Sequence, residues 1–171
     1  MRNVIFLDRD GVINNNSLYY VYKPQDVVFN DGVFETLNIL QQKGFEYIVI
    51  SNQSGISKGV YLKDDVEKVH DFMIQEFEKH GIKILEFYYC THHPDVENCL
   101  CRKPQTLLVE KAVARFNINK AQSYFVGDKQ TDLETAVNYG IIPILVEPNS
   151  NLKSIINKIS NFKSQISNSK S

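Results

Sequence analysis

Residues 4–13 read VIFLDRDGVI, and this stretch decides the fold. Its first four residues are all apolar, which is the pattern of a strand buried on both faces of a parallel sheet. Asp8 and Asp10 follow the strand directly, and Gly11 comes next. The stretch therefore predicts a buried first strand that brings two carboxylates to the edge of a sheet.

The rest of the chain alternates short apolar runs with stretches of helical periodicity. Strands are expected at 4–7, 47–50, 87–89, 123–126 and 141–146. Helices are expected at 33–43, 64–79, 107–116, 133–139 and 152–159. Pro143 makes the last strand edge-like, because proline cannot donate to a sheet ladder. This alternation predicts an α/β fold with a doubly wound (Rossmann-like) parallel sheet.

The composition is that of one globular domain. The 171 residues are 43% hydrophobic and 23% charged, which is ordinary and sufficient for a buried core. We expect a single domain over 1–160 and a polar, frayed tail over 161–171. The net charge of −1 argues against nucleic acid as a partner.

The apolar run at 4–7 is too short for a signal peptide or a membrane span. A cytoplasmic protein without a membrane partner is therefore expected. We also expect a monomer.

A second acidic cluster follows the apolar run at 123–126, where Asp128 and Asp132 stand. Asp132 can equally be read as a cap of the following helix, and Asp10-Gly11 as an ordinary bend. In a parallel sheet, however, two strand ends can bring Asp8, Asp10 and Asp128 around one hard cation such as Mg²⁺. One carboxylate can then attack a phosphorus while another donates a proton to the leaving oxygen.

Two further stretches fit phosphate chemistry. Residues 51–55, SNQSG, follow the expected strand at 47–50, and their hydroxyl and amide groups can bind phosphate oxygens. Lys103 offers the cation that a phosphoryl transition state needs. Taken alone, the first is ordinary turn chemistry and the second an ordinary surface lysine. Their place beside the acidic clusters favours a phosphate site.

Residues 90–101, CTHHPDVENCLC, hold three cysteines and two histidines. Four of these side chains match a tetrahedral Zn²⁺ site of the structural kind: Cys90, His92, Cys99 and Cys101. His93 stays an alternative to His92, and incidental cysteines or a disulfide are the competing interpretations. The expected work of this zinc-binding loop is to fold residues 90–101 and so fix Arg102 and Lys103.

Four motifs in this order resemble the haloacid dehalogenase superfamily of phosphatases: residues 8–13 (DRDGVI), 51–55 (SNQSG), 102–104 (RKP) and 127–129 (GDK) with Asp132. The zinc-binding loop narrows the resemblance to the D-glycero-D-manno-heptose 1,7-bisphosphate 7-phosphatases and the similar histidinol-phosphate phosphatases. It covers about residues 3–147. The spacer between His92 and Cys99 is nearer to the histidinol-phosphate type.

The resemblance implies a role for each matching residue. Asp8 is the nucleophile, Asp10 the general acid and then the base, and Ser51 and Lys103 steady the transferring group. The implied Mg²⁺ ligands are Asp8, the backbone carbonyl of Asp10, and Asp128.

Substrate contacts are implied for Asn52, Arg102 and Lys129, and Zn²⁺ ligation for the four loop residues above. No stretch is left for a large cap domain, so the site is expected to be open. The implied reaction is Mg²⁺-dependent removal of the 7-phosphate from a heptose bisphosphate, in nucleotide-activated heptose synthesis.

Histidinol phosphate is the alternative substrate, for which Asp95 or Glu97 could pair with the amine. Two other classes fit less well. A phosphoacceptor signalling domain would carry an aspartate where Ser51 stands. A catalytically dead binding protein would lack one of the four residues Asp8, Asp10, Lys103 and Asp128.

Overall fold

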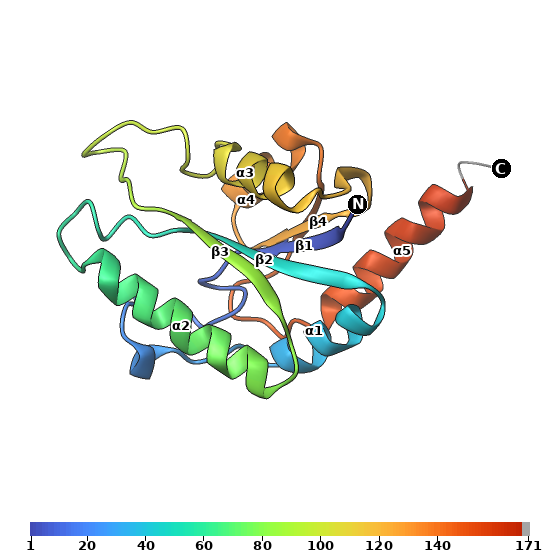
Figure 1. Cartoon of the computed structure of the whole chain (residues 1–171), viewed down its shortest axis with the longest axis horizontal. Helices are drawn as coiled ribbons and strands as arrows, with labels where there is room; N and C mark the ends of the chain where they lie inside the picture. Colours follow the sequence, from blue (N-terminus) through green and yellow to red (C-terminus); the bar gives the residue numbers. More distant parts are fainter. Residues whose placement is uncertain (169–171) are drawn as a thin grey trace.

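The structure, a computed structural model, describes residues 1–168. Within this range five parallel strands form one sheet in the order β3-β2-β1-β4-β5 (Figure 1). The strands are β1 (Asn3–Leu7), β2 (Phe45–Asn52), β3 (Ile84–Cys90), β4 (Tyr124–Gly127) and β5 (Ile142–Leu145). The predicted parallel α/β sheet is confirmed, and β5 with Pro143 lies at its edge as expected.

Helices cover both faces of the sheet (Figure 1). The α-helices are α1 (Val33–Gln42), α2 (Lys63–Lys79), α3 (Leu107–Phe116), α4 (Gln130–Tyr139) and α5 (Ser154–Asn168), with short 3-10 helices η1 (Pro24–Asp26) and η2 (Lys120–Gln122). Helices α1, α2 and α5 lie on one face, and α3 and α4 lie on the other. The two faces make the fold doubly wound.

The first strand shows why this segment forms the centre of the fold. Ile5 and Leu7 join the core under α1, α2 and α5, whereas Val4 and Phe6 join the core under α3 and α4. All four side chains are fully buried. Burial of each stabilises the fold by about 1.5–3 kcal/mol relative to exposure, so an uninterrupted apolar strand is what this position requires.

Helix α5 is longer than the sequence pattern suggested. We expected it to end at Ile159 and placed a frayed tail over 161–171, but the helix continues to Asn168. Ile155 and Ile159 anchor it in the core, and the helix carries on past them. Positions 169–171 of the expected tail lie outside the described residues.

In the part of the chain that the structure describes, the connections after β1 and β2 hold loops and helices but no further domain. Between β1 and β2 the described chain holds loops, η1 and α1, and between β2 and β3 it holds a loop and α2. This confirms the expected absence of a large cap domain within residues 1–168. The same range contains no helix that is long and apolar enough to cross a membrane.

Candidate active site

The carboxyl ends of β1 and β4 meet at the centre of the sheet. Leu7 pairs with Val126 in the ladder, and the backbone N–H of Asp8 donates to the Val126 carbonyl at 3.0 Å. Asp8 therefore lies beside the start of the segment that carries Asp128 in a loop and Asp132 in the first turn of α4.

Lys103 lies between two buried carboxylates. Its Nζ is 2.8 Å from Asp8 Oδ1 and 2.6 Å from Asp132 Oδ1, and it donates to the Ile50 carbonyl at 2.9 Å. The Asp8 carboxylate also accepts the backbone N–H of Arg9 at 2.7 Å. Asp8, Lys103 and Asp132 are all buried, so water screens their charges little.

Burial and charge act in opposite directions on these groups. Burial raises the pKa of Asp8 to about 7, although Lys103 lowers it. Burial alone would lower the pKa of Lys103, but Asp8 and Asp132 together raise it above its usual value. The lysine therefore stays charged, and Asp8 is the carboxylate that gains most from a further cation.

The donor set fits such a cation. Carboxylate oxygens of Asp8, Asp128 and Asp132 lie within 4.8 Å of one another. Asp128 Oδ1 is buried and accepts no hydrogen bond from the described residues, with the Lys129 ammonium 3.9 Å away. Burial raises the pKa of Asp128. A buried carboxylate oxygen that accepts no hydrogen bond, within a cluster of carboxylates, fits the oxygen ligands that a hard divalent cation prefers.

Asp10 is held apart from this cluster by its own set of donors. Arg9 Nη2 contacts Asp10 Oδ1 and Oδ2 at 3.0 and 2.9 Å, and Arg9 Nε donates to Oδ2 at 3.1 Å. Asn14 donates to Oδ1 at 3.0 Å and Gln53 to Oδ2 at 2.8 Å. Burial alone would raise the pKa of Asp10, but the Arg9 charge and these hydrogen bonds keep it below its usual value.

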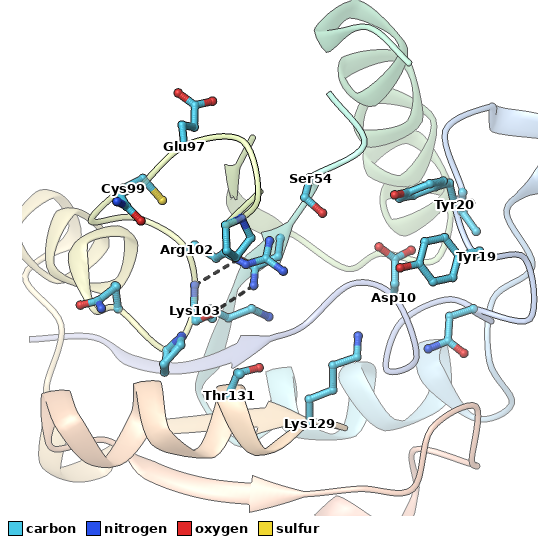
Figure 2. Close-up of a pocket in the computed structure, with 17 residues that line it drawn as sticks. Asp10, Tyr19, Tyr20, Ser54, Glu97, Cys99, Arg102, Lys103, Lys129 and Thr131 are labelled. Atoms are coloured by element: carbon cyan, nitrogen blue, oxygen red, sulfur yellow. Dashed lines mark hydrogen bonds between the residues drawn. The ribbon is translucent and has the colours of Figure 1, made fainter. Parts of the chain in front are cut away.

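Asn52 and Ser51 end strand β2 at the same edge. The Asn52 side chain accepts the Lys103 backbone N–H at 3.1 Å and donates to the Lys103 carbonyl at 3.3 Å (Figure 2). Asn52 thus holds the backbone of Lys103 in place. Ser51 is buried and lines a small cavity of about 30 Å³ together with Asp8, Lys103 and Asp132.

A larger pocket of about 700 Å³ opens in front of these residues. Figure 2 shows Tyr19, Tyr20 and Asp10 on one side of it and Arg102 on the other, with Lys129 at its base. Arg102 and Lys129 bring two cations to the pocket wall. The pocket is therefore suited to an anionic, polar ligand.

The Cys/His loop gathers its predicted side chains into one cluster. Cys90 Sγ lies 3.2 Å from Cys101 Sγ and 3.6 Å from Cys99 Sγ, and His92 Nδ1 lies 3.2 Å from Cys101 Sγ. The three cysteines are free thiols. Sulfurs bound tetrahedrally to zinc at about 2.3 Å lie about 3.8 Å apart, so the cluster has dimensions close to those of such a site.

His93 is turned away from this cluster. Its Nδ1 accepts the backbone N–H of Asp95 at 3.1 Å. The guanidinium of Arg102 donates to the His92 carbonyl at 3.1 Å, which ties the loop directly to the pocket wall.

The structure brings the residues singled out from the sequence together at this edge of the sheet, and it shows contacts that the sequence motifs did not assign. Asp132 was read as a helix cap; it does accept the Lys129 backbone N–H at 3.1 Å, but it also pairs with Lys103. Arg9 and Gln53 were not singled out, although Arg9 stands between the two catalytic candidates in sequence. For Arg9 the available signal was a charged residue placed directly after a buried strand, between two carboxylates with which it could pair.

Comparisons with known proteins agree with this geometry. Residues 100–164 match the HAD-hydrolase-like family model. The chain is similar to a solved structure of D,D-heptose 1,7-bisphosphate phosphatase from B. bronchiseptica, described as complexed with magnesium and phosphate, with a TM-score of 0.80, 29% identity, and coverage of 91% of this chain and 86% of that one. Fold and site together define a hydrolase of the haloacid dehalogenase class.

Curated relatives narrow the class. The D-glycero-alpha-D-manno-heptose-1,7-bisphosphate 7-phosphatase of Campylobacter jejuni is 40% identical over 137 residues, which are 80% of this chain and 77% of that protein. The histidine biosynthesis bifunctional protein HisB of Legionella pneumophila (strain Lens) is 34% identical over 142 residues, but these are only 40% of its length. The chain belongs to the heptose-bisphosphate 7-phosphatase family of haloacid dehalogenase phosphatases.

Proposed function

We propose that this phosphatase removes the 7-phosphate of D-glycero-D-manno-heptose 1,7-bisphosphate through an aspartyl-phosphate on Asp8, in the synthesis of nucleotide-activated heptose. The observation that carries the proposal is the placement of Asp8. It is buried beside Lys103 and the Asp128 carboxylate, in a small cavity that shares Lys103 and Lys129 with the larger pocket lined by Arg102.

In the first half of the reaction, an Asp8 oxygen attacks the phosphorus and the bond to the sugar oxygen breaks. Both contacts of Asp8 given above involve Oδ1, so Oδ2 is the oxygen suited to attack. Lys103 and the Ser51 hydroxyl neutralise and orient the transferring oxygens. Asp10 gives the leaving oxygen its proton; the pKa of Asp10 rises when a phosphate dianion enters nearby.

In the second half, water attacks the phosphorus of the aspartyl-phosphate and Asp8 is released. Asp10 takes the proton from this water. Its contacts with Arg9 favour the ionised form, which suits a base. Asn14 and Gln53 hold the same carboxylate and so fix its direction.

Two metals complete the proposal. Asp8 and Asp128, with the backbone carbonyl of Asp10, would hold Mg²⁺, which would offset the repulsion between the Asp8 carboxylate and the phosphate. The cluster of Cys90, His92, Cys99 and Cys101 would hold a structural Zn²⁺. Zinc there would fix the chain direction into Arg102 and Lys103.

The pocket favours a substrate with two phosphates. Arg102 lines only this larger pocket. Lys129 lines both this pocket and the small cavity that holds Asp8. A second phosphate can pair with these cations while the first lies at Asp8. We infer that the heptose bisphosphate enters as a free small molecule and that the protein acts as a monomer.

The test is Mg²⁺-dependent phosphate release, comparing kcat/KM for both anomers of heptose 1,7-bisphosphate with that for histidinol phosphate. We expect kcat/KM for the heptose bisphosphate to exceed that for histidinol phosphate by at least about 100-fold, or about 2.7 kcal/mol of differential transition-state binding. A preference for histidinol phosphate would overturn the substrate assignment and leave the Asp8 chemistry in place.

Histidinol phosphate is retained as the second candidate because of Glu97. This exposed carboxylate is one of the residues that line the pocket and lies at its outer rim in Figure 2, from which it could pair with a substrate amine. A Glu97→Gln variant separates the two cases. It would lower kcat/KM for histidinol phosphate and leave that for the heptose bisphosphate unchanged or raised, because a negative charge would be removed from a site for an anion.

A further inference from the structure

Gln53 is a buried amide between two of the proposed catalytic groups. It follows strand β2 directly, and only 2% of it is exposed. Its Nε2 donates to Asp10 Oδ2 at 2.8 Å and to Ser51 Oγ at 2.7 Å. Its backbone N–H donates to the Cys90 carbonyl at 2.7 Å. The side chain thus uses both amide hydrogens, one on each neighbour.

The direction of this amide is determined by its partners. Asp10 is paired with the Arg9 guanidinium and so accepts hydrogen bonds without donating any. The Gln53 nitrogen must therefore face Asp10. The Tyr61 hydroxyl donates to Gln53 Oε1 at 3.0 Å and holds the opposite end. Every polar atom of the Gln53 side chain has a partner, which gives the amide one orientation.

The orientation of Gln53 decides what the Ser51 hydroxyl can do. Because Ser51 Oγ accepts the Gln53 N–H, its own hydrogen cannot point toward Gln53. Ser51 lines the small cavity in front of Asp8 and Lys103, where a transferring phosphoryl group would lie. The hydroxyl is therefore left as a donor to that group.

The same contacts extend to the wall of the larger pocket. The Tyr61 ring stacks on Tyr22 with centroids 5.0 Å apart and meets Tyr20 edge-on at 5.5 Å, and Tyr20 lines the pocket near Asp10 (Figure 2). A side chain at Gly55 would collide with the Tyr61 ring. The Tyr20 and Tyr22 rings and the space left by Gly55 therefore hold the Tyr61 ring in place.

We infer that Gln53 is a positioning residue that aims the Ser51 hydroxyl at the phosphoryl group and holds Asp10 at a fixed distance from it, with Tyr61 locking the amide. The inference rests on phosphoryl transfer at Asp8, as proposed above. It does not depend on which sugar or amino alcohol carries the phosphate.

The first test uses Gln53→Met, which keeps the approximate size of the side chain and removes both donors. We expect kcat to fall about 10- to 100-fold, the range given for outer-shell partners at metal sites, with KM raised by a smaller factor. The matched control is Gln41→Met. The Gln41 side chain also makes two hydrogen bonds, with the backbone carbonyl of Gly81 and the backbone N–H of Lys83. These lie at the opposite end of the sheet, so the kcat of the Gln41→Met variant should equal that of the wild type. Tyr61→Phe should lower kcat in the same direction by a smaller factor.

A double-mutant cycle separates positioning from a purely structural role. If Gln53 acts partly through the serine hydroxyl, Gln53→Met costs at least about three-fold less kcat in a Ser51→Ala background than in the wild type. Equal costs in both backgrounds, or an unchanged kcat for Gln53→Met, would overturn the inference. The melting temperature of each variant shows whether folding was lost; if it was for Gln53→Met, the same cycle is read with Tyr61→Phe.

Binding of inorganic phosphate to the Mg²⁺-supplemented protein gives a readout that needs no substrate. The affinity should fall at least about three-fold in Gln53→Met and stay unchanged in Gln41→Met. If the wild type binds phosphate but does not hydrolyse heptose 1,7-bisphosphate, the proposed function fails while this comparison still decides the role of Gln53. Equal phosphate affinities for the wild type and Gln53→Met would count against it.

Discussion

Lys103 is the residue on which the centre of the site depends, because one buried ammonium is paired with both Asp8 and Asp132. Its side chain is 2% exposed, against 55% for Lys129 nearby. Removal of one partner from a buried ion pair leaves an uncompensated charge. The two lysines therefore make a matched pair for a stability measurement.

We predict that Lys103→Met lowers the free energy of unfolding by about 3 kcal/mol or more, because two buried carboxylates lose their cation. Lys129→Met should change it by less than about 0.5 kcal/mol. Denaturant unfolding at pH 8 measures both. Equal effects for the two variants would show that the buried ion pairs are not as described.

The pKa of Asp8 gives a prediction with a definite sign. Its folded-state pKa is raised from 3.8 to about 7, so the protonated form is favoured by folding. The stability contributed by this group is present below pH 4 and is lost as the pH rises toward 7. Asp8→Asn resembles the protonated form, and it should stabilise the metal-free protein more at pH 8 than at pH 5. Thermal unfolding of both proteins at the two pH values measures this; a stabilisation that is larger at pH 5 would contradict the assignment.

At the same scale, the sequence identified side chains by chemistry and missed those whose role depends on packing. Asp8, Asp10, Ser51 and Asp128 follow apolar runs, and strand ends meet at one edge in a parallel sheet. That Asp132 meets Lys103 depends on where the loop after β3 folds back. No pattern in the sequence specifies that.

At the scale of elements, the Cys/His loop is the clearest case in which spacing was sufficient. The spacing favours His92 and keeps His93 as an alternative, and the structure turns His92 toward the cysteines and His93 toward Asp95. Helix α5 was the opposite case. Its exposed positions up to Asn161 are polar, and polarity alone does not tell a solvated helix from a frayed tail.

We predict that His92→Asn abolishes the binding of one zinc ion per chain and lowers the melting temperature, because the loop loses a ligand. His93→Asn should retain the zinc and the wild-type melting temperature. Metal analysis of the purified variants and thermal unfolding provide the measurements. Zinc loss in His93→Asn rather than in His92→Asn would reverse the ligand assignment.

At the scale of the whole molecule, the sheet places all polar clusters at one edge, and no large cap covers them within residues 1–168. Recognition then falls to the loops around the pocket, which carry Tyr20, Arg102 and Lys129. The fold class and this open edge followed from the alternation of strands and helices. The shape of the pocket did not, because its walls come from the carboxyl ends of four strands that are far apart in sequence.

Because the open pocket carries two cations, we predict that removing either one raises KM more for a substrate with two phosphates than for a substrate with one. Arg102→Ala and Lys129→Ala should each raise KM for heptose 1,7-bisphosphate about ten-fold or more, since each loses a charge-assisted contact. KM for heptose 7-phosphate should rise less than about three-fold. If both substrates are affected equally, the two cations do not bind a second phosphate.

The most direct test of the account is a rapid-quench experiment with heptose 1,7-bisphosphate that carries a radiolabel only in its 7-phosphate, in the presence of Mg²⁺. The account predicts that label appears transiently on the peptide that contains Asp8, at a rate fast enough to account for kcat, and that Asp8→Asn neither acquires label nor releases phosphate. Phosphate release at the wild-type rate without label on Asp8, or label on another residue, would contradict the central claim that Asp8 is the nucleophile.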